Sequence, residues 1–148
     1  MDRRTLLRAT PLGLVALSGC VGAPGGGGGG PDRTDGVTDR TLRDTGRCET
    51  PETAAVSVSR TRVRVKGCVT GPNGCAVAAL GPTTVEADRV TVVVTTRRDA
   101  PPDTACTEAL IYRGYIARVT VAQEPTAVRV VHDPPGGRQT VTEWPEAS

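Results

Sequence analysis

The chain has 148 residues, of which 18 are Lys or Arg and 16 are Asp or Glu, so its formal net charge at neutral pH is +2. Only 2% of the residues are aromatic, and phenylalanine is absent. A charge this close to zero argues against proteins that hold nucleic acid mainly by electrostatic attraction.

The first 19 residues have the three zones of a secretory signal peptide. Arg3, Arg4 and Arg8 give a positive start, an uncharged and mildly apolar run covers residues 9–19, and small residues end that run. This order of zones is typical of a segment that is removed on export. The apolar run is too short to span a bilayer, which requires about 20 residues. We therefore predict a signal peptide over residues 1–19.

Two motifs in this region resemble known export and anchoring signals. The pair Arg3-Arg4, followed by Thr5 and two leucines, resembles the twin-arginine (Tat) motif. Leu17-Ser18-Gly19-Cys20 resembles a lipobox, whose cysteine accepts a lipid and becomes the mature amino terminus. The resemblance implies Tat export, lipidation of Cys20 and anchoring to the outer face of the cell membrane. The alternative is a chance arginine pair and an ordinary Cys20 thiol at the end of an uncleaved amphipathic helix.

The composition of the whole chain extends this resemblance. Lys66 is the only lysine among the 18 basic residues, and Gly, Thr, Pro and Val are abundant. Together with the leader, this bias resembles haloarchaeal surface lipoproteins with a small, uncharacterised cysteine-containing β domain. Cleavage after Gly19 removes three arginines and one aspartate, which leaves 15 basic and 15 acidic residues in the mature chain. No nucleic-acid partner is expected of a chain so balanced in charge.

Residues 20–47 have the composition of a flexible linker that starts at the lipidated cysteine. Six consecutive glycines, Gly25 to Gly30, precede a stretch of Asp, Arg, Thr and Gly with isolated apolar residues. So few apolar side chains cannot offset the entropy that ordering the segment would cost. A Gly-rich coil of this length reaches roughly 30 Å, so we expect the linker to hold a domain clear of the lipid surface.

Residues 48–143 consist of short β-branched runs separated by Gly, Pro and Asp, a pattern typical of an all-β domain. We predict a small β-sandwich, immunoglobulin-like in general architecture, with five to seven strands and a C-terminal tail over residues 144–148. Trp144 is expected to cover an open end of the core. The predicted strands are 54–69, 75–80, 83–86 paired with 90–96, 110–121 with a bulge at Gly114, 128–132 and an edge strand at 140–143.

Four cysteines remain once Cys20 is assigned to the lipid, and outside the membrane they should be oxidised. Four cysteines allow three pairings. Cys68 falls on the same strand face as the basic residues, where a surface segment carrying Cys48 can reach it, whereas Cys75 and Cys106 each lie at the start of an apolar strand. We therefore favour the disulfides Cys48–Cys68 and Cys75–Cys106. A four-cysteine zinc site is disfavoured because no closely spaced cysteine pair occurs, and no metal or other cofactor is expected.

No constellation of catalytic residues stands out, so we expect a protein that is not an enzyme. His132 is the only histidine, and acid–base chemistry near neutral pH would depend on it. A serine triad would need Ser57 or Ser59 beside it, and neither lies in a nucleophile elbow. The preferred interpretation is a strand-end histidine before a Pro-Pro-Gly-Gly loop. The alternatives for the whole protein are an accessory or hydrolase-like domain that uses His132, or a purely structural envelope component.

A basic row along one strand face is the most distinctive feature of the domain: Arg60, Arg62, Arg64 and Lys66 alternate at period two. Such a row can bind an acidic polysaccharide, an anionic lipid headgroup or an acidic protein partner. The preferred interpretation of the row taken alone is a solvated face whose charges pair across strands with residues such as Glu86 or Glu108 and guard an edge against aggregation. For the whole chain we nevertheless expect a cell-surface lipoprotein that acts by non-catalytic binding or envelope interaction, and the sequence names no ligand.

Overall fold

A computed structural model describes residues 36–146, which form eight strands and no helix. The predicted signal peptide, the twin arginines, Cys20 and the glycine run lie outside the described residues. No helix in this part of the chain is long and apolar enough to cross a membrane. The strands are β1 (Val37–Arg47), β2 (Thr53–Ser59), β3 (Arg62–Gly71), β4 (Ala76–Glu86), β5 (Arg89–Arg98), β6 (Ile111–Val121), β7 (Ala127–His132) and β8 (Gln139–Trp144).

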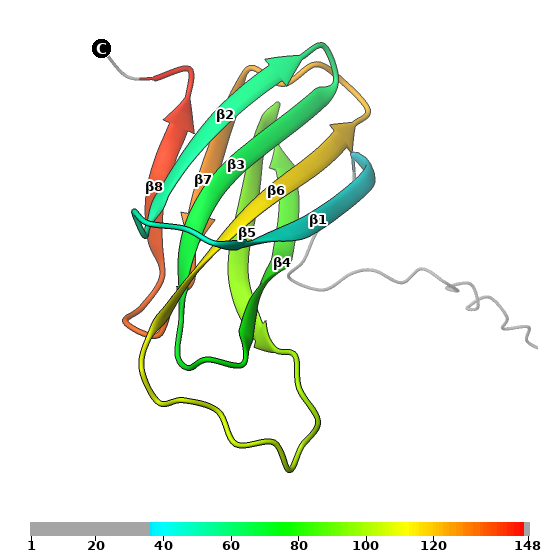
Figure 1. Ribbon diagram of the computed structural model, residues 1–148. Helices are drawn as coiled ribbons and strands as arrows, with labels where there is room; N and C mark the ends of the chain where they lie inside the picture. Colours follow the sequence, from blue (N-terminus) through cyan, green and yellow to red (C-terminus); the bar gives the residue numbers. More distant parts are fainter. Residues whose placement is uncertain (1–35, 147–148) are drawn as a thin grey trace, which may run out of the picture. The chain divides into compact units, whose positions relative to one another are not determined.

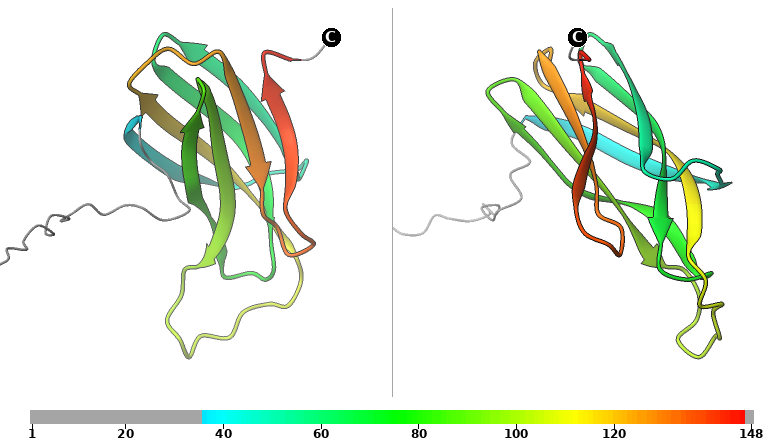
Figure 2. Two further views of the ribbon diagram at one scale, coloured as in Figure 1. Left: turned by 180° about the vertical axis from the view of Figure 1, so that it is seen from behind. Right: turned by 90° about the vertical axis from the view of Figure 1, so that its left-hand side faces the viewer.

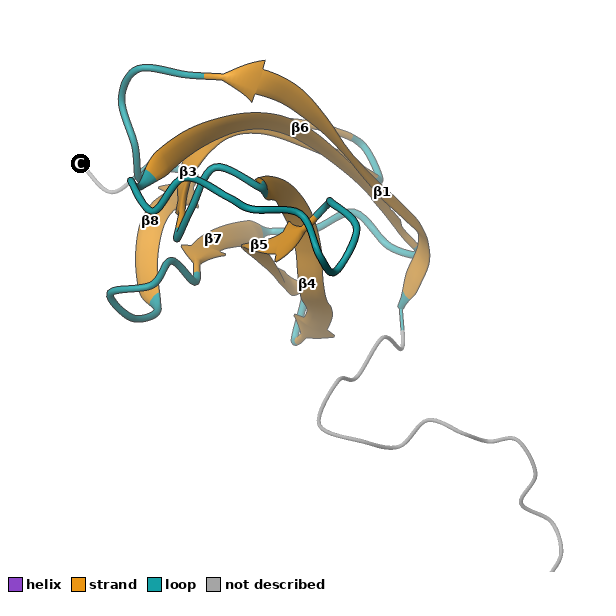
Figure 3. Ribbon diagram, turned by 60° about the horizontal axis from the view of Figure 1, so that its bottom comes forward, coloured by secondary structure: helices purple, strands orange, loops and turns teal. Residues whose placement is uncertain are grey.

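The strands form two four-stranded sheets that face each other, so the fold class is the all-β sandwich that the sequence predicts. One sheet has the order β1-β6-β3-β2 and the other the order β4-β5-β7-β8. Figure 1 shows the first sheet in front of the second, and the tilted view of Figure 3 shows them as two layers. Neighbouring strands run antiparallel except β5 and β7, which are parallel. The long loop between β5 and β6 extends beyond the strand ends (Figure 2).

The core between the layers is built mainly of valine. Val63 and Val65 of β3 face Val90, Val92 and Val94 of β5, and all five side chains are buried. Because successive side chains of a strand point to opposite faces, the polar residues between the valines of β3 are turned to solvent. Trp144 packs against the core as expected, as the last residue of β8 rather than the first of a tail.

The first predicted strand, residues 54–69, is wrong as a single element because it is a hairpin of β2 and β3. Ser59 pairs with Arg62, and the two-residue turn between them contains Arg60 at a φ of 58°. The predicted strands 75–80 and 83–86 are in turn one strand, β4, with a register shift between Leu80 and Thr83. The predicted pairing of this region with β5 is present.

The end of the predicted linker also differs, because residues 37–47 form β1 and lie inside the domain. β1 pairs with β6 along its whole length, with Leu42 opposite Ala117. Asp44 accepts hydrogen bonds from the Arg113 side chain of β6 and from the Ala78 backbone N–H of β4. The bulge predicted at Gly114 is on the partner strand instead, as a register shift between Asp44 and Gly46.

The two disulfides join the cysteine pairs that the sequence favours. Cys48–Cys68 ties the segment after β1 to β3, with a Cα–Cα distance of 6.0 Å. Cys75–Cys106 ties the start of β4 to the loop before β6, with a Cα–Cα distance of 5.4 Å. The sulfurs of all four cysteines are therefore used in these two disulfides.

Candidate functional site

The solvent-facing side of the β1-β6-β3-β2 sheet contains three cross-strand rows of side chains. The sheet register places one residue from each strand side by side, in the strand order β2, β3, β6, β1. The first row is Ser59, Arg62, Thr120 and Asp39; the second is Ser57, Arg64, Arg118 and Thr41; the third is Ala55, Lys66, Ile116 and Arg43.

This face, which we call the basic face, is defined by five cations and one carboxylate. The cations are Arg43, Arg62, Arg64, Lys66 and Arg118, and the carboxylate is Asp39. None of the five cations forms an ion pair with another residue of the described range 36–146. Like charges on neighbouring strands repel one another, so a bound anion would lower the electrostatic energy of this face.

The first two rows of the basic face enclose a groove with a volume of about 490 Å³. Its walls carry the guanidinium groups of Arg62, Arg64 and Arg118, and its ends approach Asp39 on β1 and the serines of β2. The hydroxyl of Thr120 lies between Arg62 and Asp39 in the first row, and those of Ser57, Ser59 and Thr41 lie at the ends of the two rows. Guanidinium groups donate to planar anions through two parallel hydrogen bonds, and hydroxyl groups both donate and accept.

Comparisons with protein-family models, with curated proteins and with solved structures found no match to this chain.

The basic face corrects two expectations from the sequence. Arg60 does not belong to the row, because it lies in the β2–β3 turn. Glu86 ends β4 in the opposite sheet and Glu108 lies in the loop before β6, so neither is a cross-strand neighbour of the row. The actual neighbours of Arg62 and Arg64 are hydroxyl groups and Arg118, and those of Lys66 are Ala55 and Ile116. With no carboxylate of the described residues directly beside the row, the face is more basic than predicted. The hydroxyls of Ser57 and Ser59 belong to this groove and make no hydrogen bond with His132 within residues 36–146.

A second polar cluster lies between the two sheets, around His132. Its Nε2 atom is 2.7 Å from the hydroxyl of Tyr115 on β6, and its Nδ1 atom is 2.8 Å from Oε1 of Glu52. The other carboxylate oxygen of Glu52 accepts from the backbone N–H of Thr70. Since an ionised carboxylate only accepts, Nδ1 carries the proton and the Tyr115 hydroxyl donates to Nε2.

Burial controls the proton affinities in this cluster. The side chains of His132 and Tyr115 are fully buried, whereas about a fifth of Glu52 is exposed. Burial lowers the pKa of His132 below its ordinary value, although the hydrogen bond and charge of Glu52 act in the opposite direction. Burial, and to a lesser extent the Glu52 charge, raises the pKa of Tyr115. The imidazole and the phenol are therefore both neutral at pH 7.

The order of groups in this Glu52–His132–Tyr115 cluster resembles that of a catalytic relay. Unlike that of a catalytic relay, however, the histidine of this cluster is closed to solvent and substrate. Both ring nitrogens of His132 already have partners, and no part of the ring reaches solvent. A substrate would have no contact with the imidazole in this arrangement. The cluster instead joins β6 of one sheet to β7 of the other, which is consistent with the preferred interpretation of His132 as a structural strand-end residue.

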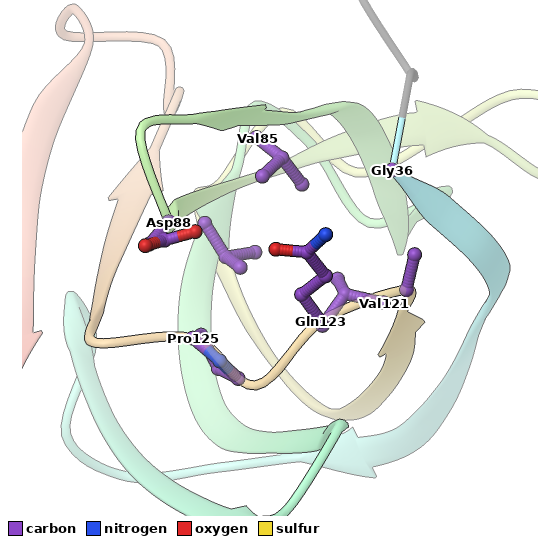
Figure 4. Close-up of a pocket in the computed structure, with 8 residues that line it drawn as sticks. Gly36, Val85, Asp88, Val121, Gln123 and Pro125 are labelled. Carbon is purple, nitrogen blue, oxygen red and sulfur yellow. The ribbon is translucent and has the colours of Figure 1, made fainter.

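A small pocket at one end of the sandwich was not expected from the sequence. Val85, Val90, Val121 and Pro125 supply its apolar walls, and Gln123 and Asp88 are the polar side chains that line it (Figure 4). Its volume of about 110 Å³ is smaller than that of a cavity which accepts benzene, about 150 Å³. It has no cation and is separate from the basic face.

Sequence reasoning found three of the five cations of the basic face and missed Arg43, Arg118 and Asp39. The signal for Arg118 was present, because it alternates with Ala117 and Val119 on a predicted strand. Its position beside Arg64 depends on the β3–β6 register, which pairs these two residues across 54 positions of the chain. Arg43 and Asp39 were missed because β1 was taken as linker.

Proposed function

We propose that this protein is a lipid-anchored module of the cell surface that binds an anionic partner through its basic face, without catalysis. The observation that supports the proposal best is the set of five cations on one sheet face with a single carboxylate among them. The two disulfides are consistent with an oxidising compartment outside the cytoplasm. As part of this proposal, the strands of the sandwich have a general arrangement like that of immunoglobulin domains.

The anchor is proposed from the sequence motifs alone. In this proposal Arg3 and Arg4 direct Tat export, residues 1–19 are removed, and Cys20 carries the lipid that holds the protein at the outer face of the membrane. Replacing Cys20 with serine removes the thiol that accepts the lipid, so we expect the protein to move from the membrane fraction to the soluble fraction. An unchanged distribution after fractionation would contradict the lipid anchor, and it would leave the binding proposal intact.

The binding proposal is tested by charge reversal on the second row. The double substitution Arg64→Glu and Arg118→Glu places two carboxylates where two guanidinium groups lie side by side. We expect binding to isolated cell-surface material to fall at least tenfold, and binding of the unchanged protein to weaken as salt is added. A matched control reverses Arg89 and Arg97, two exposed arginines at the start and near the end of β5 in the other sheet. Equal effects of the two double substitutions, or no effect of either, would contradict a specific role of the basic face.

A further inference from the structure

The groove on the basic face carries more than positive charge. Three guanidinium groups share its surface with four hydroxyl groups, and the carboxylate of Asp39 lies at its β1 end. A surface that only attracts polyanions gains nothing from a carboxylate, because Asp39 repels every phosphate or carboxylate that approaches it. A ligand that uses all the groups in the groove must offer anionic groups and hydroxyl groups together.

From this combination we infer that the groove binds an acidic polysaccharide, a linear chain of hydroxylated sugars bearing carboxylate or sulfate groups. This inference rests on the proposed function and names the class of its anionic partner. Arg64 and Arg118 lie side by side in the second row and bind an acidic group of the chain, while Arg62 in the first row is placed for another. Asp39 accepts hydrogen bonds from sugar hydroxyls, and the serine and threonine hydroxyls complete the polar contacts.

The dimensions of the groove suit a polymer that crosses the strands. Neighbouring strands lie about 4.8 Å apart, so the four strands from β2 to β1 present polar groups over roughly 14 Å. The first two rows are two residues apart along each strand, which separates them by roughly 7 Å. A chain of sugars lying across the strands can therefore contact both serines of β2 at one end and Asp39 of β1 at the other.

Two other anionic macromolecules fit the groove less well. Single-stranded nucleic acids gain affinity by stacking their bases on aromatic side chains, and no aromatic side chain lines this groove. Firm binding to a membrane surface combines electrostatic attraction with apolar side chains that insert between the lipids. The groups that project from this groove are guanidinium, hydroxyl and carboxylate, and the valines in its lining belong to inward-facing positions of the sheet.

Replacing Asp39 with asparagine separates sugar recognition from simple charge attraction. The probes are polygalacturonate, a polyphosphate of matched charge, and phosphatidylglycerol vesicles, each titrated against the purified full-length protein with Cys20→Ser, so that no lipid on Cys20 contributes to vesicle binding. For the unchanged protein we expect the tightest binding to polygalacturonate. In the variant, polygalacturonate affinity should fall about five- to tenfold, because charged hydrogen bonds to sugar hydroxyls are lost. Polyphosphate affinity should stay equal or rise, because a repelling charge is removed.

The controls distinguish failure of this inference from failure of the proposed function. Asp103→Asn makes the same charge change in the exposed loop after β5, and it should leave both affinities unchanged. The Arg64→Glu, Arg118→Glu variant should lose binding to every polyanion; if it binds all probes like the unchanged protein, the proposed function fails. If that variant loses binding but Asp39→Asn strengthens polygalacturonate and polyphosphate alike, the polysaccharide inference alone is wrong. Tightest binding to the vesicles, insensitive to Asp39→Asn, would point to a lipid surface instead.

Discussion

Gly67 of β3 occupies a position where no side chain fits. A Cβ atom added there would lie 2.6 Å from the Thr53 carbonyl oxygen and 2.6 Å from the Tyr115 hydroxyl. The hydroxyl in turn is fixed by its hydrogen bond to His132. The absence of a side chain at Gly67 is therefore what allows Tyr115 to reach across to the opposite sheet.

We expect Gly67→Ala to lower the free energy of unfolding by about 1–3 kcal/mol, the usual cost of overpacking a core. Chemical denaturation at pH 7 measures this change. Gly136→Ala is the matched control, because a Cβ at Gly136 would meet nothing within 4 Å, and its effect should stay within about 0.5 kcal/mol. Similar effects at the two positions would mean that the Tyr115 contact does not limit residue 67.

The lowered pKa of His132 predicts a loss of stability in mild acid. In the unfolded chain the pKa of His132 is near its ordinary value of about 6.5, and in the folded protein it lies below that. Between these two values the unfolded state binds more protons, so stability is full above about pH 6.5 and falls as the pH decreases toward the folded pKa. The slope for one proton is at most about 1.4 kcal/mol per pH unit.

Unfolding free energies measured from pH 7.5 to 5 for the unchanged protein and for His132→Gln test this. The groups that face the imidazole are Glu52 and Tyr115, and the variant retains both. The variant should be less stable at pH 7.5, and the difference between the two proteins should shrink in acid because glutamine does not titrate. A difference that is constant over this range would contradict a depressed pKa.

Nothing in the sequence connects Glu52, Tyr115 and His132. Their separations along the chain are 63 and 17 residues, and each residue alone has an ordinary explanation in a turn or a strand. Glu52 has a φ of 57°. This is the left-handed region, which glutamate adopts uncommonly and which the sequence does not indicate. Only the pairing of the sheets brings the three side chains together.

At the scale of elements, β1 shows why apolar patterning can miss a strand. Only Val37 and Leu42 are apolar enough to indicate a buried face. Two other contacts of the strand are polar: Asp44 bonds Arg113, and the Arg40 guanidinium donates to the Gly81 carbonyl of β4. Burial of Asp44 opposes its ionisation, but the hydrogen bonds from Arg113, Ala78 and Gly46 outweigh it and lower its pKa. A polar strand held by such bonds has the composition of a linker.

A chain that begins at Cys48 should therefore fail to fold cooperatively, although Cys48 is the domain boundary that the sequence predicts. Loss of β1 exposes the edge of β6 and leaves Arg113 without its carboxylate. An uncovered edge strand favours aggregation. Thermal unfolding by circular dichroism and size-exclusion chromatography would compare it with a chain that begins at Pro31. Equal unfolding midpoints for the two chains would show that β1 is dispensable.

The β2–β3 hairpin, in contrast, has a signal in its sequence that the prediction of a single strand over residues 54–69 overlooked. Apolar residues occupy even positions at Val56 and Val58, then odd positions at Val63 and Val65. A single extended strand cannot change the parity of its buried face, so a turn is required between Val58 and Val63. The two-residue turn at Arg60 is this break.

For the whole molecule, the sequence predicted the layers better than their connections. Alternating valines indicated two sheets with a common core, and the strand face of Cys68, together with the positions of the other three cysteines relative to the predicted strands, indicated the two disulfides. The parallel pairing of β5 with β7 has no local signal, because β6 lies between them in the chain and belongs to the other sheet. The composition of the basic face follows from these long-range pairings.

The pairing of β1 with β6 also determines when β1 can join its sheet as the chain is synthesised. Leu42 of β1 pairs with Ala117 of β6. β1 therefore has no partner strand until the chain beyond residue 111 has been synthesised. All-β domains dominated by such distant pairings fold in milliseconds to seconds, slower than helical domains of similar size. During most of synthesis, therefore, residues 1–35 are joined to a strand that has not yet entered its sheet.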